Sequence, residues 1–413
     1  MSDTPEAIAP TPPEIPPAEK EAEALAQPGA LALLKVFRHR NYRLFFSGQL
    51  VSLMGTWITS IAQGWLVYTL TGSPFLLGLT SFAGQIPVFF FSAIGGMIAD
   101  RVDRRRLLIV TQGLAMCQAA ALAALTLTNV VTVWEIIALA LFKGFVNAVD
   151  VPTRQAFTID MVGREDLRNA ISLNSVMFNL ARVIGPGIAG LLVALVGEGL
   201  CFTIDAISYG AVLFSLILMQ LQDRPHPARE EPWRALKSGF VYAWRQKQIR
   251  VALMLVAASS MFGAAYLSMM PAVARDLLHQ GSEGLGLLMG SVGVGALIGA
   301  YTLSRIHERH LALTPILSAL MFGASLIAFS HSRWLPLSMV LLLPAAFSLM
   351  LLGGSTNTII QTVASDHMRG RVVAFYAMFF MGMMPWGALL LGWIANRFGV
   401  TDAITLGGMV VIA

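Results

Sequence analysis

The residues best suited to chemistry in this sequence lie in one short turn, which reads GMIADRVDRRR over Gly96–Arg106. Two aspartates, Asp100 and Asp103, stand among four arginines there. Carboxylates and guanidinium groups at this spacing form charge-assisted pairs, and a carboxylate can also cap the N-terminus of a nearby helix. The chemistry indicated by this turn is therefore ion pairing or helix capping.

A second charged residue stands apart from this turn. Lys143 lies inside an apolar run, where an ionised side chain costs roughly 2.5–3.5 kcal/mol on insertion scales. It must face a polar cavity or pair with an acid, and the nearest acids within apolar runs are Asp150 and Asp205. Two interpretations stay open: contact with an anionic substrate or a coupling ion, and a structural pair or a snorkelling side chain.

The elements that must position these residues are long and apolar. The chain has 413 residues, of which 56% are hydrophobic and 12% are charged, about half the charged fraction of a soluble domain. The apolar residues come in continuous runs, so the bilayer is the solvent and the predicted fold class is an all-α membrane protein. Cys117 and Cys201 lie in such runs, and the sequence indicates neither a metal site nor a disulfide framework.

Apolar runs of about 20 residues predict twelve transmembrane helices. The last has thirteen residues, too few to cross a hydrocarbon core of about 30 Å, so it is predicted to be truncated or incomplete. The predicted spans lie near 44–70, 75–99, 107–128, 134–150, 170–196, 200–220, 249–270, 284–304, 311–330, 335–360, 372–396 and 401–413.

The basic residues predict the orientation. With the N-terminus in the cytoplasm, 23 of the 28 Lys and Arg residues fall in cytoplasmic segments and three fall in outer loops. The positive-inside rule therefore places the turn Gly96–Arg106 on the cytoplasmic side. The basic character reflects topology, so the expected partner is the lipid bilayer and nucleic acid is not expected.

The chain divides into two halves on one pattern. The longest internal hydrophilic stretch separates six spans from six, and each half has a charged loop that ends one span and begins the next. Parallel repeats of this kind are a transporter plan. The predicted parts are a disordered Pro-, Glu- and Ala-rich cytoplasmic tail over 1–36, a six-helix bundle over 37–221, a cytoplasmic linker over 222–248 and a second bundle over 249–413.

On these residues the sequence resembles the major facilitator superfamily, whose twelve helices form two pseudo-symmetric six-helix bundles. The turn Gly96–Arg106 resembles the superfamily signature between spans 2 and 3, although Asp103 stands where many members have Gly. The matching loop of the second half, Gly299–His310, keeps its Gly and Arg305 but has Ser304 in place of the Asp.

Span 5 carries a second match, RVIGPGIAG over Arg182–Gly190, which resembles a Gly-Pro signature seen mainly in exporters. The wider stretch Asp150–Gly190 is similar to the subfamily of the enterobactin exporter and related drug efflux proteins, and the whole resemblance covers about residues 37–400. One position departs from the superfamily: Ala140 stands where many proton-coupled members have Arg, and Lys143 is the only cation of this span.

The resemblance implies a secondary active transporter of the bacterial cytoplasmic (inner) membrane, a monomer that needs no cofactor and is not an enzyme. It implies export of a small organic molecule, such as a siderophore, a drug or another amphipathic compound, by alternating access in exchange for protons. The sequence shows no P-loop. Two alternatives stay open: an importer or lysophospholipid flippase of the same fold, and a sensor that binds ligand without transport.

The gating role implied for the turn rests on Asp100, which can pair with Arg101, Arg104 or the more distant Arg154 and hold the cytoplasmic side shut. Anchoring of the loop to lipid headgroups is the alternative. The candidate gating residues are Gly96, Asp100, Arg101, Asp103, Arg104 and Arg105, with Arg154 as the candidate partner.

The span 5 candidates allow a bend and close approach to a neighbour, expected to be the Gly-rich span over 284–304. Tight packing alone is the alternative, and the arginine is expected to contact a helix carbonyl or an acid. These candidates are Arg182, Gly185, Pro186, Gly187 and Gly190. The candidates for the cavity or for coupling, with interhelical hydrogen bonds as the alternative, are Lys143, Asp150, Asp205, Gln49, Gln63, Gln85, Asn147, Asn179 and Asn357.

Overall fold

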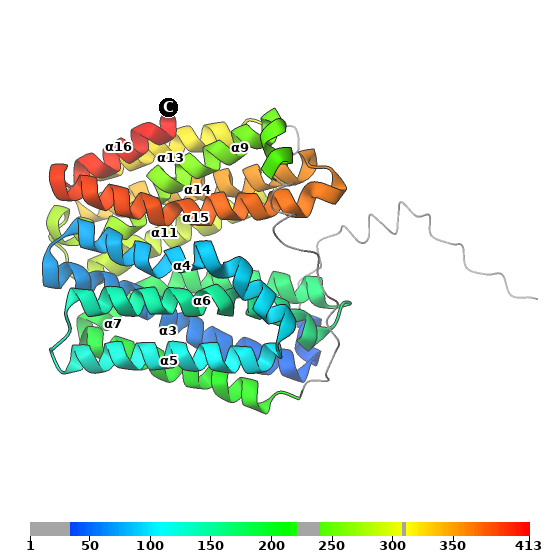
Figure 1. Ribbon diagram of the computed structural model, residues 1–413. Coiled ribbons are helices and arrows are strands. Elements are labelled where there is room, and N and C mark those ends of the chain that lie inside the picture. The colour runs from blue at the N-terminus through cyan, green and yellow to red at the C-terminus, as the bar shows by residue number, and fades with distance from the viewer. Residues whose placement is uncertain (1–33, 221–239, 308–310) are drawn as a thin grey trace, which may run out of the picture.

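The chain is built from helices throughout the part that the structure describes (Figure 1). The computed structural model describes residues 34–220, 240–307 and 311–413. The predicted tail over 1–36 lies almost wholly outside the described residues, and so do residues 222–239 of the predicted linker. The described part of that linker begins with a short helical stretch over 240–245.

The first bundle is drawn from blue to green in the lower part of Figure 1. It begins with a 3-10 turn, and its last helix supplies two spans. Gly197 interrupts that helix with a φ of 79°, a conformation that a residue without Cβ adopts readily. The elements are η1 (Lys35–Arg38), α3 (Arg40–Thr71), α4 (Pro74–Arg101), α5 (Arg104–Leu127), α6 (Val133–Val162) and α7 (Leu167–Leu218).

The second bundle, which ends in red at the top of Figure 1, begins with an irregular span. This span runs over Lys247–Leu277 and changes from α-helix into π-helical and 3-10 stretches. Its parts are α9 (Lys247–Ala258), η2 (Ser259–Gly263), η3 (Ala264–Met269), α10 (Met270–Ala272) and η4 (Val273–Leu277). The helices that follow are α11 (Ser282–Leu303), α13 (Thr314–His331), α14 (Leu335–Val363), α15 (Asp366–Phe398) and α16 (Val400–Ile412).

The described helices reproduce the twelve predicted spans. Ten helical stretches are long and apolar enough to cross a membrane, and one of them, α7, supplies two spans across Gly197. The shorter α16 is the last span. The fourth span is longer than predicted, because α6 continues for three further turns past Asp150 to Val162 and carries charged residues to the end of the bundle.

Two helix pairs make the main contacts between the bundles, α4 with α15 and α7 with α11. These are spans 2 and 11 and spans 5 and 8, so a pseudo-twofold that relates the halves exchanges the two contacts. Both contacts are built on glycines. A Cβ at Gly78 would lie 2.2 Å from the Ala388 carbonyl oxygen, and a Cβ at Gly190 would lie 2.5 Å from Gly286 Cα. The bundles are thus packed backbone against backbone.

The turn Gly96–Arg106 marks one end of the bundles, called the basic end below, and the other is called the opposite end. At the basic end, the start of α3 is tied to the start of α7, because Arg38 Nη2 and His39 Nε2 lie 2.8 and 2.7 Å from Asp166 Oδ2. The hydrogen bond with His39 and the Arg38 guanidinium hold the pKa of Asp166 below its usual 3.8, although partial burial acts to raise it. Asp166 therefore fixes the entry of the first span.

Candidate functional site

The predicted gating turn forms an ion cluster centred on Arg104. Its Nη2 atom lies 3.2 Å from Asp100 Oδ1, and its Nη1 atom lies 3.1 Å from Asp160 Oδ2 on α6. Nη1 also donates to the Ala156 carbonyl and Nε donates to the Ala99 carbonyl, both at 3.3 Å. The Arg104 side chain is only 10% exposed. Through these bonds it joins α4, α5 and α6 within the first bundle.

The other charged residues of the turn have separate surroundings. Asp103 Oδ1 accepts a hydrogen bond from the Arg106 backbone amide at 2.6 Å and caps the start of α5. Arg105 donates to the Leu216 and Ile217 carbonyls, both at 2.7 Å, near the C-terminus of α7, where the helix dipole favours a cation. The first and last arginines of the turn are exposed.

Arg154, predicted as a partner for Asp100, instead pairs with Asp150. Its Nη2 atom lies 3.3 Å from Asp150 Oδ2, one helical turn away on α6. Asp150 Oδ1 also accepts hydrogen bonds at 2.8 Å from Thr111 Oγ1 and Gln112 Nε2 of α5. Both oxygens of this buried carboxylate are therefore occupied inside the first bundle, away from the cavity described below.

The glycine that packs closely on α6 is Gly95, just before the turn, and not Gly96. A Cβ added to Gly95 would lie 2.1 Å from the Ala148 carbonyl oxygen, so no side chain fits there. At Gly96 the nearest atom to an added Cβ is Pro152 Cβ at 3.9 Å, an ordinary contact distance. The close approach of α4 to α6 thus depends on Gly95, which the sequence pattern did not single out.

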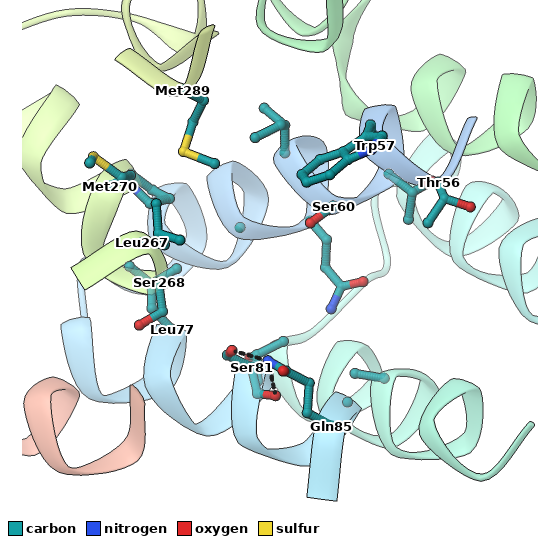
Figure 2. Close-up of a pocket in the computed structure, with 18 of the residues that line it drawn as sticks. Thr56, Trp57, Ser60, Leu77, Ser81, Gln85, Leu267, Ser268, Met270 and Met289 are labelled. Atoms are coloured by element: carbon teal, nitrogen blue, oxygen red, sulfur yellow. Dashed lines mark hydrogen bonds between the residues drawn. The ribbon is translucent and has the colours of Figure 1, made fainter. Parts of the chain in front are cut away.

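A cavity of about 430 Å³ lies between the two bundles (Figure 2). Figure 2 shows Trp57 and Ser60 of α3 on one side and Ser81 and Gln85 of α4 on another, with Gln85 Nε2 donating to Ser81 Oγ at 3.0 Å. The irregular span and α11 supply the wall from the second bundle, with Leu267, Ser268, Met270, Pro271, Leu285 and Met289. Both bundles therefore contribute residues to the lining of one cavity.

Four of the predicted cavity residues line this space, namely Gln63, Gln85, Lys143 and Asn147. The other five do not, and Asp150 and Asp205 are the two acids among them. Gln49 is buried in the first bundle, Asn179 is half-buried and donates to the Ser175 carbonyl at 2.8 Å, and Asn357 is half-buried on α14. A neutral amide in an apolar run therefore did not indicate by itself which side of its helix faces the cavity.

Lys143 pairs with Asp205 between α6 and α7. Its Nζ atom lies 3.6 Å from Asp205 Oδ2 and 5.8 Å from the centre of the Tyr209 ring. The Asp205 side chain is completely buried, and its Oδ1 atom accepts a long hydrogen bond from Ser208 Oγ at 3.4 Å. A Cβ at Gly55 of α3 would lie 2.6 Å from Oδ1. The partner of Lys143 is therefore the acid of the sixth span and not the acid on its own helix.

The Gly-Pro stretch of α7 makes the contact with α11 that was expected. A Cβ at Gly190 would lie 2.5 Å from Gly286 Cα, whereas a Cβ at Gly187 would have no atom within 4 Å. Gly185 faces the first bundle instead, where Trp57 Cβ would lie 2.8 Å from an added Cβ. Gly185 therefore packs within the first bundle, and Gly190 makes the contact between the bundles.

The two remaining residues of this stretch differ in surroundings. Pro186 is buried inside α7, and its carbonyl oxygen would lie 3.1 Å from a Cβ added to Gly286. The Arg182 side chain is exposed, and the contact with a carbonyl or an acid expected for it is absent among the described residues. Its backbone carbonyl instead faces Gly293 of α11, where an added Cβ would lie 3.1 Å away.

At the opposite end, three residues join the bundles and are called the latch below: Tyr68, Arg275 and Asp276. Tyr68 Oη donates to Asp276 Oδ2, and Arg275 Nη1 donates to the Tyr68 carbonyl at 3.3 Å. The Arg275 guanidinium also lies 5.9 Å from the centre of the Tyr68 ring. Beside the latch, Ser73 Oγ lies 3.1 Å from Asn396 Oδ1. The sequence pattern did not single out Arg275, although its acidic neighbour at the end of a span was a usable signal.

Two related bundles around a central cavity, with paired contacts of spans 2 and 11 and of spans 5 and 8, form a transporter architecture. A major facilitator family model described as a transmembrane secretion effector matches residues 32–413. The chain belongs to this family. The predicted fold class, a membrane protein of two six-helix bundles, is confirmed with it.

Relatives of this chain are named as transporters of siderophores or drugs. The staphyloferrin A transporter of Staphylococcus aureus (strain NCTC 8325 / PS 47) is 28% identical over 89% of this chain and 92% of its own. The multidrug efflux pump Tap of Mycolicibacterium fortuitum is 26% identical over 84% and 87% of the two chains. The enterobactin exporter EntS of Shigella boydii serotype 4 (strain Sb227) is 26% identical over 88% and 86%. The predicted resemblance to the enterobactin exporter subfamily is confirmed.

Solved structures of the superfamily share the fold at low identity. The nucleoside transporter NupG aligns with a TM-score of 0.64 at 16% identity, over 90% of this chain and 95% of that chain. A bacterial homologue of the human lysosomal transporter Spinster, in an inward-facing and occupied conformation, aligns with a TM-score of 0.70 at 14% identity, over 91% and 95%.

The contact between α7 and α11 predicts unequal effects of two neighbouring glycine substitutions. Gly190→Ala places a methyl group 2.5 Å from Gly286 Cα, so it is expected to destabilise the protein by about 1–3 kcal/mol, the usual cost of overpacking. Gly187→Ala, the matched control, enters open space and is expected to leave stability nearly unchanged. Thermal unfolding of both purified variants in detergent measures the difference, and equal midpoints would contradict the packing argument.

Proposed function

We propose that this protein is a secondary active exporter, which moves a small organic molecule out of the cell by alternating access. The observation that carries the proposal is the cavity between two bundles that are joined at the opposite end. A siderophore, a drug or another amphipathic compound is the proposed substrate. Relatives named as an efflux pump and an exporter support the outward direction.

The contacts at the opposite end support one state of this cycle. The latch, with Gly78 and Gly190, brings the bundles together on that side of the cavity, so we assign entry to the basic end. By the positive-inside rule the basic end and the N-terminus are cytoplasmic. The described state is then the one that takes up substrate from the cytoplasm.

The irregular span offers a physical link between the cavity and the latch. Leu267, Ser268 and Met270 line the cavity, and Arg275 and Asp276 of the latch follow within two helical turns on the same span. Stretches of 3-10 and π-helix within a helix often mark hinges at functional sites. We propose that substrate contact with this wall and release of the latch are linked through these turns.

The Arg104 cluster has a different role in the proposal. Its ion pairs with Asp100 and Asp160 lie within the first bundle, so they do not join the bundles in this state. We propose that they hold the turn Gly96–Arg106 in the position against which the second bundle closes when the cavity opens outward. Proton exchange as the driving force and a monomer in the bacterial inner membrane complete the proposal.

A transport assay tests the function directly. Cells with and without the protein are loaded with a catecholate siderophore, a macrolide, a cationic dye or a lysophospholipid, and accumulation is measured with and without an uncoupler. Export driven by a proton gradient predicts lower accumulation of at least one compound, reversed by the uncoupler. Higher accumulation would indicate import, and binding without any flux would indicate a sensor.

The Arg104 cluster predicts that a neutral amide at one acid blocks the cycle. Asp100→Asn removes the charge that Arg104 binds at 3.2 Å, so flux of any exported compound is expected to fall at least about tenfold, the equivalent of 1.4 kcal/mol. Membrane insertion should be intact, which fractionation checks. Asp402→Asn, an exposed acid at the opposite end, is the matched control. Undiminished flux in Asp100→Asn would remove the turn from the mechanism.

The latch predicts a shift in the distance between the bundles. Tyr68→Phe removes only the hydroxyl that donates to Asp276, and the loss of a hydrogen bond to a charged group, about 1.5–3 kcal/mol, is expected to favour separation at the opposite end. Spin labels at the exposed Val130 and Trp334, one in each bundle at this end, report the distance. Tyr301→Phe, on an exposed ring of α11, serves as the control. An identical distance distribution in Tyr68→Phe would show that this hydrogen bond does not stabilise the contact between the bundles.

A further inference from the structure

The cavity lining includes one basic side chain and no acidic one among the described residues. Of the described residues that line it, Lys143 is the only one with an ionisable side chain. The remaining lining is neutral, with hydrogen-bonding groups such as Gln63, Gln85 and Asn147 and an apolar part that includes Trp57 and Met384. A ligand in this space therefore meets one positive charge, and no acid among the described lining residues offsets it.

The partner of Lys143 stands behind the cavity wall. Asp205 does not line the cavity, its side chain is completely buried, and it is shielded by α3 at Gly55. The distance of 3.6 Å from Lys143 Nζ to Asp205 Oδ2 exceeds the 2.7–2.9 Å of a strong charge-assisted hydrogen bond. Asp205 Oδ2 makes no hydrogen bond among the described residues. Asp205 therefore neutralises the charge of the Lys143 ammonium group without using all of its hydrogen-bond donors.

This arrangement leaves donors for a ligand. An ammonium group has three N–H donors, and the two side chains that interact with that of Lys143, Asp205 and Tyr209, leave at least one of them for a ligand. Asp150 shows the contrast, because Arg154, Thr111 and Gln112 occupy both of its oxygens. A cationic ligand would be repelled by Lys143, and no acidic residue among the described lining would bind it. An anionic ligand would form an ion pair with Lys143 in a site of low dielectric constant.

We propose that the cavity binds organic anions, with the acidic group of the ligand on Lys143, its apolar body against Trp57 and Met384, and Asp205 as the counter-ion of the empty site. A volume of about 430 Å³ falls within the range of sites for drug-sized ligands. This inference rests on the proposed function only in taking the cavity as the substrate site, and it makes Lys143 the residue that determines substrate charge.

Two dyes of one ring system test the proposal on purified protein in nanodiscs. Fluorescein is an anion and rhodamine 123 is a cation, and their shared xanthene body separates charge from shape. We expect the wild type to bind fluorescein at least tenfold more tightly than rhodamine 123, as measured by fluorescence anisotropy. Tighter binding of rhodamine 123, or no binding of fluorescein, would overturn the proposal. Because no gradient is present, failure of export in cells would leave this result unchanged.

Variants then test whether Lys143 causes the preference for the anionic dye. Lys143→Met is expected to lose at least tenfold in fluorescein affinity, and Lys143→Arg, which keeps the charge, is expected to retain most of it. Lys247→Met removes an exposed lysine at the basic end and serves as the control. Since Lys143→Met alone leaves Asp205 unpaired in the interior, the double variant Lys143→Met with Asp205→Asn removes both charges and protects the fold. Full fluorescein affinity in the double variant would overturn the proposal.

Discussion

The structure depends on close helix contact at glycines, because a bilayer gives helices little hydrophobic reason to associate. On one side of the cavity, Gly78 of α4 packs against α15, and on the other, Gly190 of α7 meets Gly286 of α11. Each contact sets backbone against backbone and leaves no room for a side chain. Larger residues such as Trp57 and Met384 border the space beside these contacts, so the position of the cavity follows from where the small residues stand.

Ionisable groups inside the helices obey a second constraint, since each must be paired or solvated. Asp150 meets it completely, with a guanidinium, a hydroxyl and an amide on its two oxygens. Lys143 meets it through a long contact with Asp205 and a contact with Tyr209, and it lies at the cavity wall. The difference between a saturated and an unsaturated pair separates a charge that stabilises a bundle from a charge that is available to a ligand.

Features with a local sequence signal were predicted correctly, whereas contacts between segments distant in the sequence were missed. Apolar runs predicted the twelve spans, and the Gly-Pro stretch predicted the contact of α7 with α11, because both signals are local. Arg154 was assigned to Asp100, since a residue one helical turn away and one on another helix cannot be ranked without coordinates. The latch was missed for the same reason: Tyr68 and Asp276 stand more than 200 residues apart, and only the packing of the bundles brings them together.

The long pair between Lys143 and Asp205 also has an electrical consequence. With both side chains ionised, the empty cavity carries no net charge, and a bound monovalent anion makes it negative. The loaded protein would then move one negative charge outward, in addition to any charge that exchanged protons carry inward. A potential negative inside favours that movement by about 2.3 kcal/mol per 100 mV for a full crossing. This corresponds to roughly a 50-fold concentration ratio, so for such a substrate the membrane voltage is itself a driving force for export.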